Sequence, residues 1–227
     1  MTSEHFVFVP MVFLIGYFLG GFMSTLSAHT SAKNTTSESD NPVIRNAKPT
    51  SGKQVLAALT LFLAMFVITH VFALPYSVQA VKESNGGVAI LDQSPSFTNE
   101  EVYSRLTEFG ESGRAVYKRF VYTTDVIFPL TLLLFLVLLV RYSREKASFN
   151  HKFDKILLLL PFVWFGIDML ENTMTFSLIS QYPRPSVVVG DVIGYVTVAK
   201  FSLLLSSILA SLFIYLYGKS NLVFRAN

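Results

Sequence analysis

Apolar runs of about twenty residues constrain the fold of this chain more than any other feature. Such a run crosses a hydrocarbon core about 30 Å thick as a helix that rises about 1.5 Å per residue. They occupy residues 6–28, 54–73, 120–140, 156–179 and 191–217. The chain is also 52% hydrophobic, which is typical of membrane proteins. We therefore predict an all-α integral membrane protein with five transmembrane helices, one N-terminal anchor plus a four-helix bundle.

Changes in composition divide the chain into an anchor, a linker and a bundle. Residues 1–28 are predicted to be a retained N-terminal transmembrane anchor. Residues 29–52 are rich in Ser, Thr, Asn and Pro, a composition that cannot bury a core and predicts a flexible polar linker. Residues 53–218 are predicted to form the four-helix transmembrane domain, with an extracytoplasmic segment at 76–119. Residues 219–227 remain as a cytoplasmic tail.

Small residues recur at every fourth position along the predicted anchor, among them Gly16 and Gly20. Such a strip lets another helix approach closely. The partner is either another helix of the same chain or a second copy of the protein.

The segment between the second and third spans is predicted to hold short extracytoplasmic helices. Asn85-Gly86 is a turn sequence that predicts a short hairpin. Thr98 is a helix-capping residue, and the helix that it begins is expected to end at Gly110. A further helix is predicted to start near Ser112 and to continue unbroken into the membrane, because the residues that follow include no helix breaker.

The fourth span carries a polar stripe formed by Asp168, Glu171 and Asn172. Their spacing of three and four residues places them on one face of a helix. A charged residue at bilayer depth costs roughly 2.5–3.5 kcal/mol even on the insertion scale, so it usually faces a partner helix or a wet cavity. The best partner is Lys200, the only basic residue well inside the last span. We expect these four side chains to form a buried polar centre.

Two carboxylates and one ammonium group do not balance in charge. Burial and a neighbouring like charge both favour the neutral form of an acid. We therefore expect Asp168 or Glu171 to keep its proton at neutral pH. The centre is either an ion pair that fixes helix register without a ligand, or a site for a ligand, a proton or a substrate.

Pro129 lies inside the third span, four residues after Asp125. A proline has no amide hydrogen and clashes with the carbonyl of residue i−4, so the backbone oxygen that it frees belongs to Asp125. A carboxylate beside a free carbonyl predicts either a cation, proton or hydroxyl site, or a plain helix kink. In the second case the carboxylate pairs with a nearby base, and the candidates are Arg114, Lys118, Arg119 and His70.

Asp125 and His70 lie near the outer ends of their spans, above the polar centre. Arg114 and Tyr117 lie on the helix that leads into the third span. We expect Arg114, Tyr117 and His70 to line an outer mouth of the centre.

Lys and Arg are concentrated in the loops after the first and third spans and in the C-terminal tail. The positive-inside rule then places the N-terminus outside and the C-terminus in the cytoplasm. We expect the protein in the bacterial inner (plasma) membrane.

Several kinds of chemistry lack their sequence motifs. The chain has no Cys, which removes thiolate metal sites and a cysteine nucleophile. It also has no HExxH, no GxSxG and no Gly-rich phosphate loop. No Lys/Arg stripe indicates nucleic-acid binding. We therefore expect no metal, no cofactor and no nucleic-acid partner.

Three motifs together resemble an uncharacterised family of small four-helix membrane proteins. They are the G-x-x-G-R-x-x-Y run from Gly110 to Tyr117, the D-x-x-x-P run that begins at Asp125, and the D-x-x-E-N run that begins at Asp168. A late lysine, Lys200, completes the pattern. The resemblance covers residues 55–217 and implies the architecture and the choice of residues, but no activity.

Three functions fit these features. The first is a non-enzymatic protein that binds a lipid or small amphiphile, or scaffolds a complex with other membrane proteins or with copies of itself. The second is a small membrane enzyme in which Asp168 and Glu171 act as acid and base on a lipid-like substrate. The third and least favoured is an ion-coupled or proton-coupled permease, because no internal repeat is visible.

Overall fold

The computed structural model describes residues 49–147 and 151–226. The predicted anchor, with Gly16 and Gly20, and most of the predicted linker lie outside these residues. Within the described ranges the regular structure is helical and includes no strand. Helical segments in this part of the chain that are long and apolar enough to cross a membrane are Gly52–His70, Gly110–Glu145, Ile156–Gln181 and Val187–Tyr217. The chain is therefore a helical membrane protein, and the four spans of the predicted bundle are present.

Helix α2 spans Gly52–His70 and begins with a capping box. The hydroxyl of Ser51 accepts from the Gln54 amide at 3.3 Å, and the Gln54 side chain accepts from the Ser51 amide at 2.8 Å. Thr50 then ties this end to α6, because its amide donates to Glu145 at 2.7 Å. The helix ends at His70, three residues before the predicted end at 73.

Short helices α3 (Val78–Ser84), α4 (Asn99–Glu108) and α5 (Gly110–Val121) follow α2. The predicted hairpin at Asn85 is wrong, because the residues before the turn form the last turn of α3. The turn itself is present, and the Asn85 side chain closes it by donating to the Val88 carbonyl at 2.8 Å. The capping by Thr98 and the stop at Gly110, whose φ is +64°, are confirmed.

The predicted continuous helix from Ser112 into the membrane is interrupted. α5 ends at Val121, and α6 (Thr124–Ala147) begins after a two-residue break. The Thr123 hydroxyl at this break donates to the Arg119 carbonyl at 2.7 Å. The Thr123 amide donates instead to the Phe120 carbonyl at 3.1 Å, and the hydroxyl takes the Arg119 acceptor that the amide leaves, so this backbone group stays satisfied at the break.

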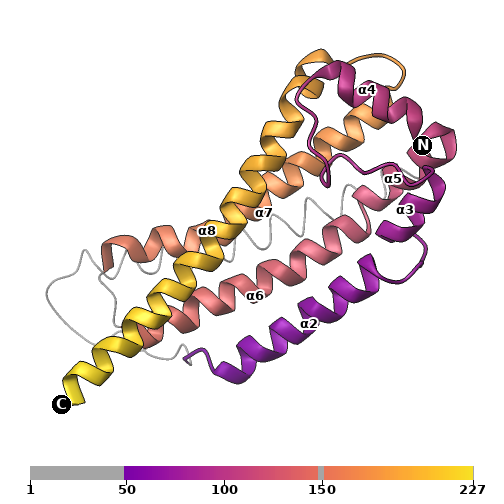
Figure 1. Ribbon diagram of the computed structural model, residues 1–227. Coiled ribbons are helices and arrows are strands. Elements are labelled where there is room, and N and C mark those ends of the chain that lie inside the picture. Colours follow the sequence, from indigo (N-terminus) through magenta and orange to yellow (C-terminus); the bar gives the residue numbers. More distant parts are fainter. Residues whose placement is uncertain (1–48, 148–150, 227) are drawn as a thin grey trace, which may run out of the picture. The chain divides into compact units, whose positions relative to one another are not determined.

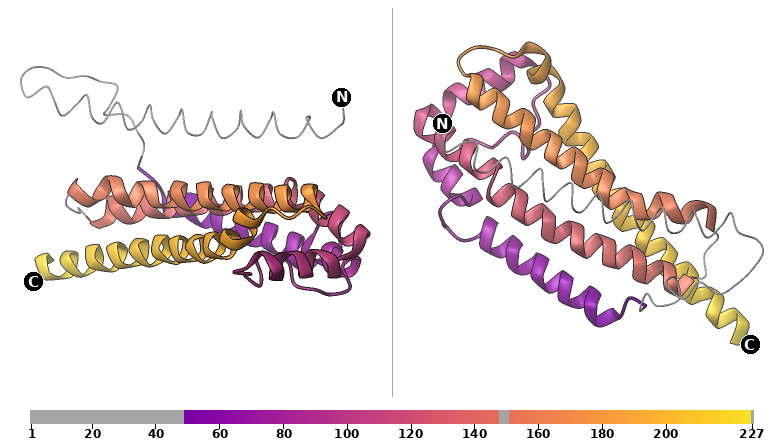
Figure 2. Two further views of the ribbon diagram at one scale, coloured as in Figure 1. Left: turned by 90° about the horizontal axis from the view of Figure 1, so that it is seen from above. Right: turned by 180° about the vertical axis from the view of Figure 1, so that it is seen from behind.

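The long helices α7 (His151–Gln181) and α8 (Val187–Ala226) complete the bundle (Figure 1). Helix α8 continues through most of the predicted tail. α6 packs against α2, α7 and α8, whereas α2 packs on α6 and α3. α8 lies to one side of α6 and α7 and crosses them at an angle (Figure 2).

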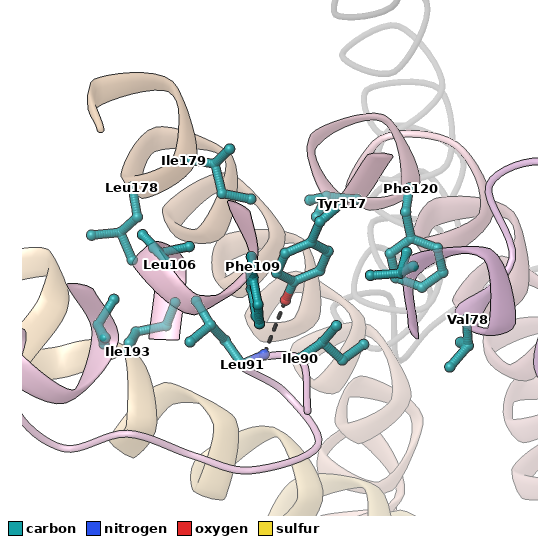
Figure 3. Close-up of a cluster of buried hydrophobic side chains, with 13 residues drawn as sticks. Val78, Ile90, Leu91, Leu106, Phe109, Tyr117, Phe120, Leu178, Ile179 and Ile193 are labelled. Carbon is teal, nitrogen blue, oxygen red and sulfur yellow. Dashed lines mark hydrogen bonds between the residues drawn. The ribbon is translucent and has the colours of Figure 1, made fainter. Parts of the chain in front are cut away.

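A cap of short helices and a loop closes one end of the bundle. We use this name for α3, α4, α5 and the loop 85–98, and we call that loop the roof. Buried apolar side chains from the cap pack against the end of α7 and the start of α8 (Figure 3). Tyr117 lies inside this cluster, and its hydroxyl accepts a hydrogen bond from the Leu91 amide at 3.2 Å. The roof is thereby attached to α5.

The roof and the start of α4 also rest directly on the backbone of α8. A Cβ added to Gly194 would overlap the backbone oxygen of Ser96, and one added to Gly190 would lie 2.8 Å from the Asn99 side-chain oxygen. Next to this contact, the Asn99 amide donates to the Asp191 carboxylate at 2.7 Å. Glycine is therefore required here for close approach of two backbones.

We expect Gly194→Ala to lower the free energy of unfolding by about 1–3 kcal/mol, because the added methyl group overpacks the contact with the roof. Thermal unfolding in lipid nanodiscs measures the change, and proteolysis of the roof shows whether this loop has come loose. The matched control is Gly166→Ala in α7, where an added Cβ meets nothing within 4 Å. Equal stability of the two variants would contradict the close contact.

Candidate functional site

An ion pair joins α7 to α8 in the middle of the bundle. The Lys200 ammonium pairs with Glu171 and lies 3.3 Å from the nearer oxygen of Asp168. The side chains of Lys200 and Asp168 are each 7% exposed, and that of Glu171 is 1% exposed. The Thr197 hydroxyl, one turn before Lys200, donates to the second oxygen of Glu171. The structure thus brings together the predicted partners of the polar stripe.

Asn172 on the same stripe faces a different neighbour. Its side-chain amide donates to the backbone oxygen of Asp125 at 2.8 Å. This is the carbonyl that Pro129 leaves without a helical partner. A side chain of α7 therefore satisfies the helix kink in α6, and the bond joins these two helices.

A pocket of about 590 Å³ lies beside this centre, under the roof. Its apolar wall comes from α2, α6 and α8 and includes Phe62, Phe66, Phe128, Leu132, Phe201 and Leu204. Its polar wall comes mainly from the roof and the central ion pair and includes His70, Asp92, Gln93, Asp125, Asp168 and Lys200. A cavity that combines a large apolar surface with a few polar groups is typical of small-molecule sites.

Three of the lining residues each carry a buried polar atom that has no hydrogen-bond partner among the described residues. These atoms are one carboxylate oxygen of Asp92, one of Asp168, and the indole nitrogen of Trp164. Buried polar groups are almost always hydrogen-bonded, and each exception calls for an explanation such as a bound molecule. Trp164 is 3% exposed, so bulk solvent does not satisfy it.

Not all of the residues predicted for the outer mouth reach the pocket. His70 lines it, and the imidazole ring stacks on Phe66 with a centroid distance of 4.4 Å. Tyr117 is instead in the apolar cluster of the cap. Arg114 donates to the Leu106 carbonyl at 2.7 Å and lies over the ring of Tyr182, 3.9 Å from its centroid. Both residues hold the cap together.

Asp92 is the acidic residue of the pocket that the sequence did not single out. It lies in the roof, between the second and third predicted spans, and no motif surrounds it. Only the docking of the roof onto α5 and α8 brings it over the bundle. In the sequence Asp92 is one of several acidic residues between the second and third predicted spans, and nothing distinguishes it from the others.

In residues 49–147 and 151–226, no group of three or more His, Asp or Glu side chains is arranged to hold a metal ion. No family model matches the chain, and no curated protein or solved structure matches it at a significant level. The class of protein that the fold and the site define is a helical membrane protein with a polar centre beside a pocket.

We expect Asn172→Leu to lower the free energy of unfolding by about 1–3 kcal/mol, because the Asp125 carbonyl then loses its donor. In a Pro129→Ala background the same substitution should have a much smaller effect, since the amide of residue 129 can bond that carbonyl within α6. A double-mutant cycle of unfolding free energies measures the coupling. Additive effects would show that Asn172 acts elsewhere.

We expect Lys200→Met to lower the free energy of unfolding by about 3–5 kcal/mol, because it leaves buried carboxylates without their cation. Adding Asp168→Leu and Glu171→Leu should restore most of the loss. The amount of folded protein in membranes and its thermal unfolding provide the measurement, with Lys53→Met at the exposed start of α2 as the matched control. A triple variant no more stable than Lys200→Met would contradict this account of the ion pair.

Proposed function

We propose that this membrane protein binds a lipid or small amphiphile in the pocket under the roof. The observation that carries the proposal is the pairing of an extended apolar wall with buried polar atoms that lack partners. The apolar wall suits a hydrocarbon tail, because burial of such a chain contributes about 0.8 kcal/mol per methylene group. The polar atoms suit a head group that can donate and accept hydrogen bonds.

The arrangement of the helices supports entry of this molecule from the bilayer. The pocket is lined by both α2 and α8, yet α2 packs chiefly on α6 and α3, and α8 on α4, α6 and α7. Phe66 on α2 and Phe201 on α8 line the pocket and are still 42% and 50% exposed. Both residues belong to helices that are long and apolar enough to span a membrane. An amphiphile would therefore enter sideways, between these two helices.

Orientation is part of the proposal. Described basic residues at the end of the bundle away from the cap include Lys53, Arg141 and Arg144. The cap carries its basic residues together with many acidic ones. Because positive charge marks the cytoplasmic side, the proposed topology puts the cap and the roof outside a bacterial plasma membrane.

A second candidate function rests on Asp168. One of its carboxylate oxygens lies near the Lys200 ammonium, and the other is without a partner in a residue that lines the pocket. A carboxyl group held in this way suits general acid or base chemistry on a bound molecule. The same pocket would then belong to an enzyme that acts on a lipid-like substrate.

The experiment is mass spectrometry of the molecules that co-purify with the protein from native membranes. We expect wild type to retain a discrete lipid or amphiphile and Leu204→Trp to lose at least 80% of it, because the larger ring fills the pocket (about 80% loss corresponds to roughly 1 kcal/mol or more in affinity). The matched control is Leu205→Trp, one residue further along α8, where the side chain is 57% exposed and does not line the pocket.

Retention that is equal in the two variants would contradict binding at this pocket. A retained molecule that is chemically altered by wild type, but not by Asp168→Asn, would favour the enzyme over the binding protein.

A further inference from the structure

The pocket wall carries more acidic than basic side chains. Asp92, Asp125 and Asp168 all line the pocket, and Lys200 is the one Lys or Arg side chain that does so among the described residues. The ammonium of Lys200 is already engaged by Glu171 and Asp168. Asp92 and Asp125 therefore add acidic groups to the wall beyond the two carboxyl groups that contact Lys200.

The unpartnered atoms indicate which chemical groups a ligand of this pocket carries. One oxygen of Asp92 and one of Asp168 accept no hydrogen bond from the described residues. Asp168 is also more than nine-tenths buried, so the oxygen cannot rely on bulk water. An ionised carboxylate only accepts hydrogen bonds, so a ligand that brings a positive charge and N–H donors both favours the ionised form and complements it. A donor that is also positively charged forms the stronger, charge-assisted bond.

The same wall disfavours other head groups. A phosphate or carboxylate head would add negative charge to a wall that already holds more acidic than basic groups, and juxtaposed like charges at a binding surface cost several kcal/mol. A metal ion is disfavoured because the described residues include no cluster arranged to ligate one. The aromatic residues Phe66, Phe128 and Trp164 also line the pocket, and aromatic faces attract organic cations.

We propose that the ligand is a long-chain primary amine, an amphiphile whose ammonium head group lies among Asp92, Asp125 and Asp168. Its N–H donors satisfy the free carboxylate oxygens, and its tail lies along the apolar wall toward Leu132 and Leu204. This inference rests on the proposed function, because it names the class of molecule that the same pocket binds.

The single tryptophan of the chain provides the measurement. Trp164 lines the pocket, so its fluorescence reports on an occupant. The protein is purified, reconstituted in phosphatidylcholine nanodiscs and titrated with dodecylamine, dodecanol and dodecanoate. We expect a saturable change with dodecylamine at a Kd at least about tenfold below that of dodecanol, and the weakest binding with dodecanoate; tenfold corresponds to about 1.4 kcal/mol.

Variants test whether the preference comes from the named carboxylates. The double variant Asp92→Asn and Asp125→Asn should reduce the preference for the amine over the alcohol to about threefold or less. Neither substitution removes an ion pair with Lys200, and the side chains keep their shape, so matched thermal unfolding can confirm the fold. The control is Glu100→Gln, an exposed carboxylate of α4 that does not line the pocket.

The outcomes separate the two proposals. Equal affinities of wild type for the amine and the alcohol, or an unchanged preference in the folded double variant, would overturn the inference but leave amphiphile binding intact. No saturable change with any of the three probes, together with equal retention by the Leu204→Trp and Leu205→Trp variants, would overturn both.

Discussion

Burial of charge inside the spans is the constraint on which the rest of the structure depends. Lys200 cannot lie in hydrocarbon without a counter-charge, and α7 supplies two carboxylates on one face. α7 and α8 must therefore turn these faces toward each other, which fixes the rotation of both helices about their axes. Asn172 lies beside Glu171 in sequence but points to α6, where it binds the carbonyl freed by Pro129. A single stripe on α7 thus positions two neighbouring helices.

The pocket lies beside α2, the one spanning helix among the described residues that the polar stripe of α7 does not bind. α6, α7 and α8 are joined by buried polar contacts, whereas α2 is joined to the bundle mainly through α6 and α3. Space between α2 and α8 is therefore left unfilled beneath the roof. The central ion pair forms one wall of that space, so the groups that stabilise the bundle also face any molecule that occupies it.

The sequence predicted the four spans of the bundle and the polar centre between α7 and α8 well, because both depend on local patterns. Apolar runs of sufficient length set the helices, and spacing along one helix set the stripe opposite Lys200. The free carbonyl of Asp125 also followed from Pro129 alone. The role of Asn172 as its donor did not, because it depends on the distance between α6 and α7.

Long-range docking explains the parts that sequence patterns missed. Asp92 reaches the pocket only because the roof packs on the glycines of α8, and Tyr117 enters the cap because α5 ends before the membrane-spanning part of α6 begins. The break between α5 and α6 is two residues long and leaves no periodic pattern in the sequence. The predicted hairpin failed for a related reason, since the turn residues were compatible with both a hairpin and the end of a helix.

The contact of Gly194 with the roof links the cap to the central ion pair. Gly194 contacts the roof and Lys200 forms the ion pair, and the two residues lie less than two helical turns apart on α8. At Gly194 the backbone of the roof lies directly against the backbone of α8, with no side chain between them to adapt to a movement. Any tilt or rotation of α8 that loosens the roof therefore also displaces the buried ammonium from its carboxylates. The contact that holds the roof and the ion pair that joins α7 to α8 thus depend on the position of the same helix.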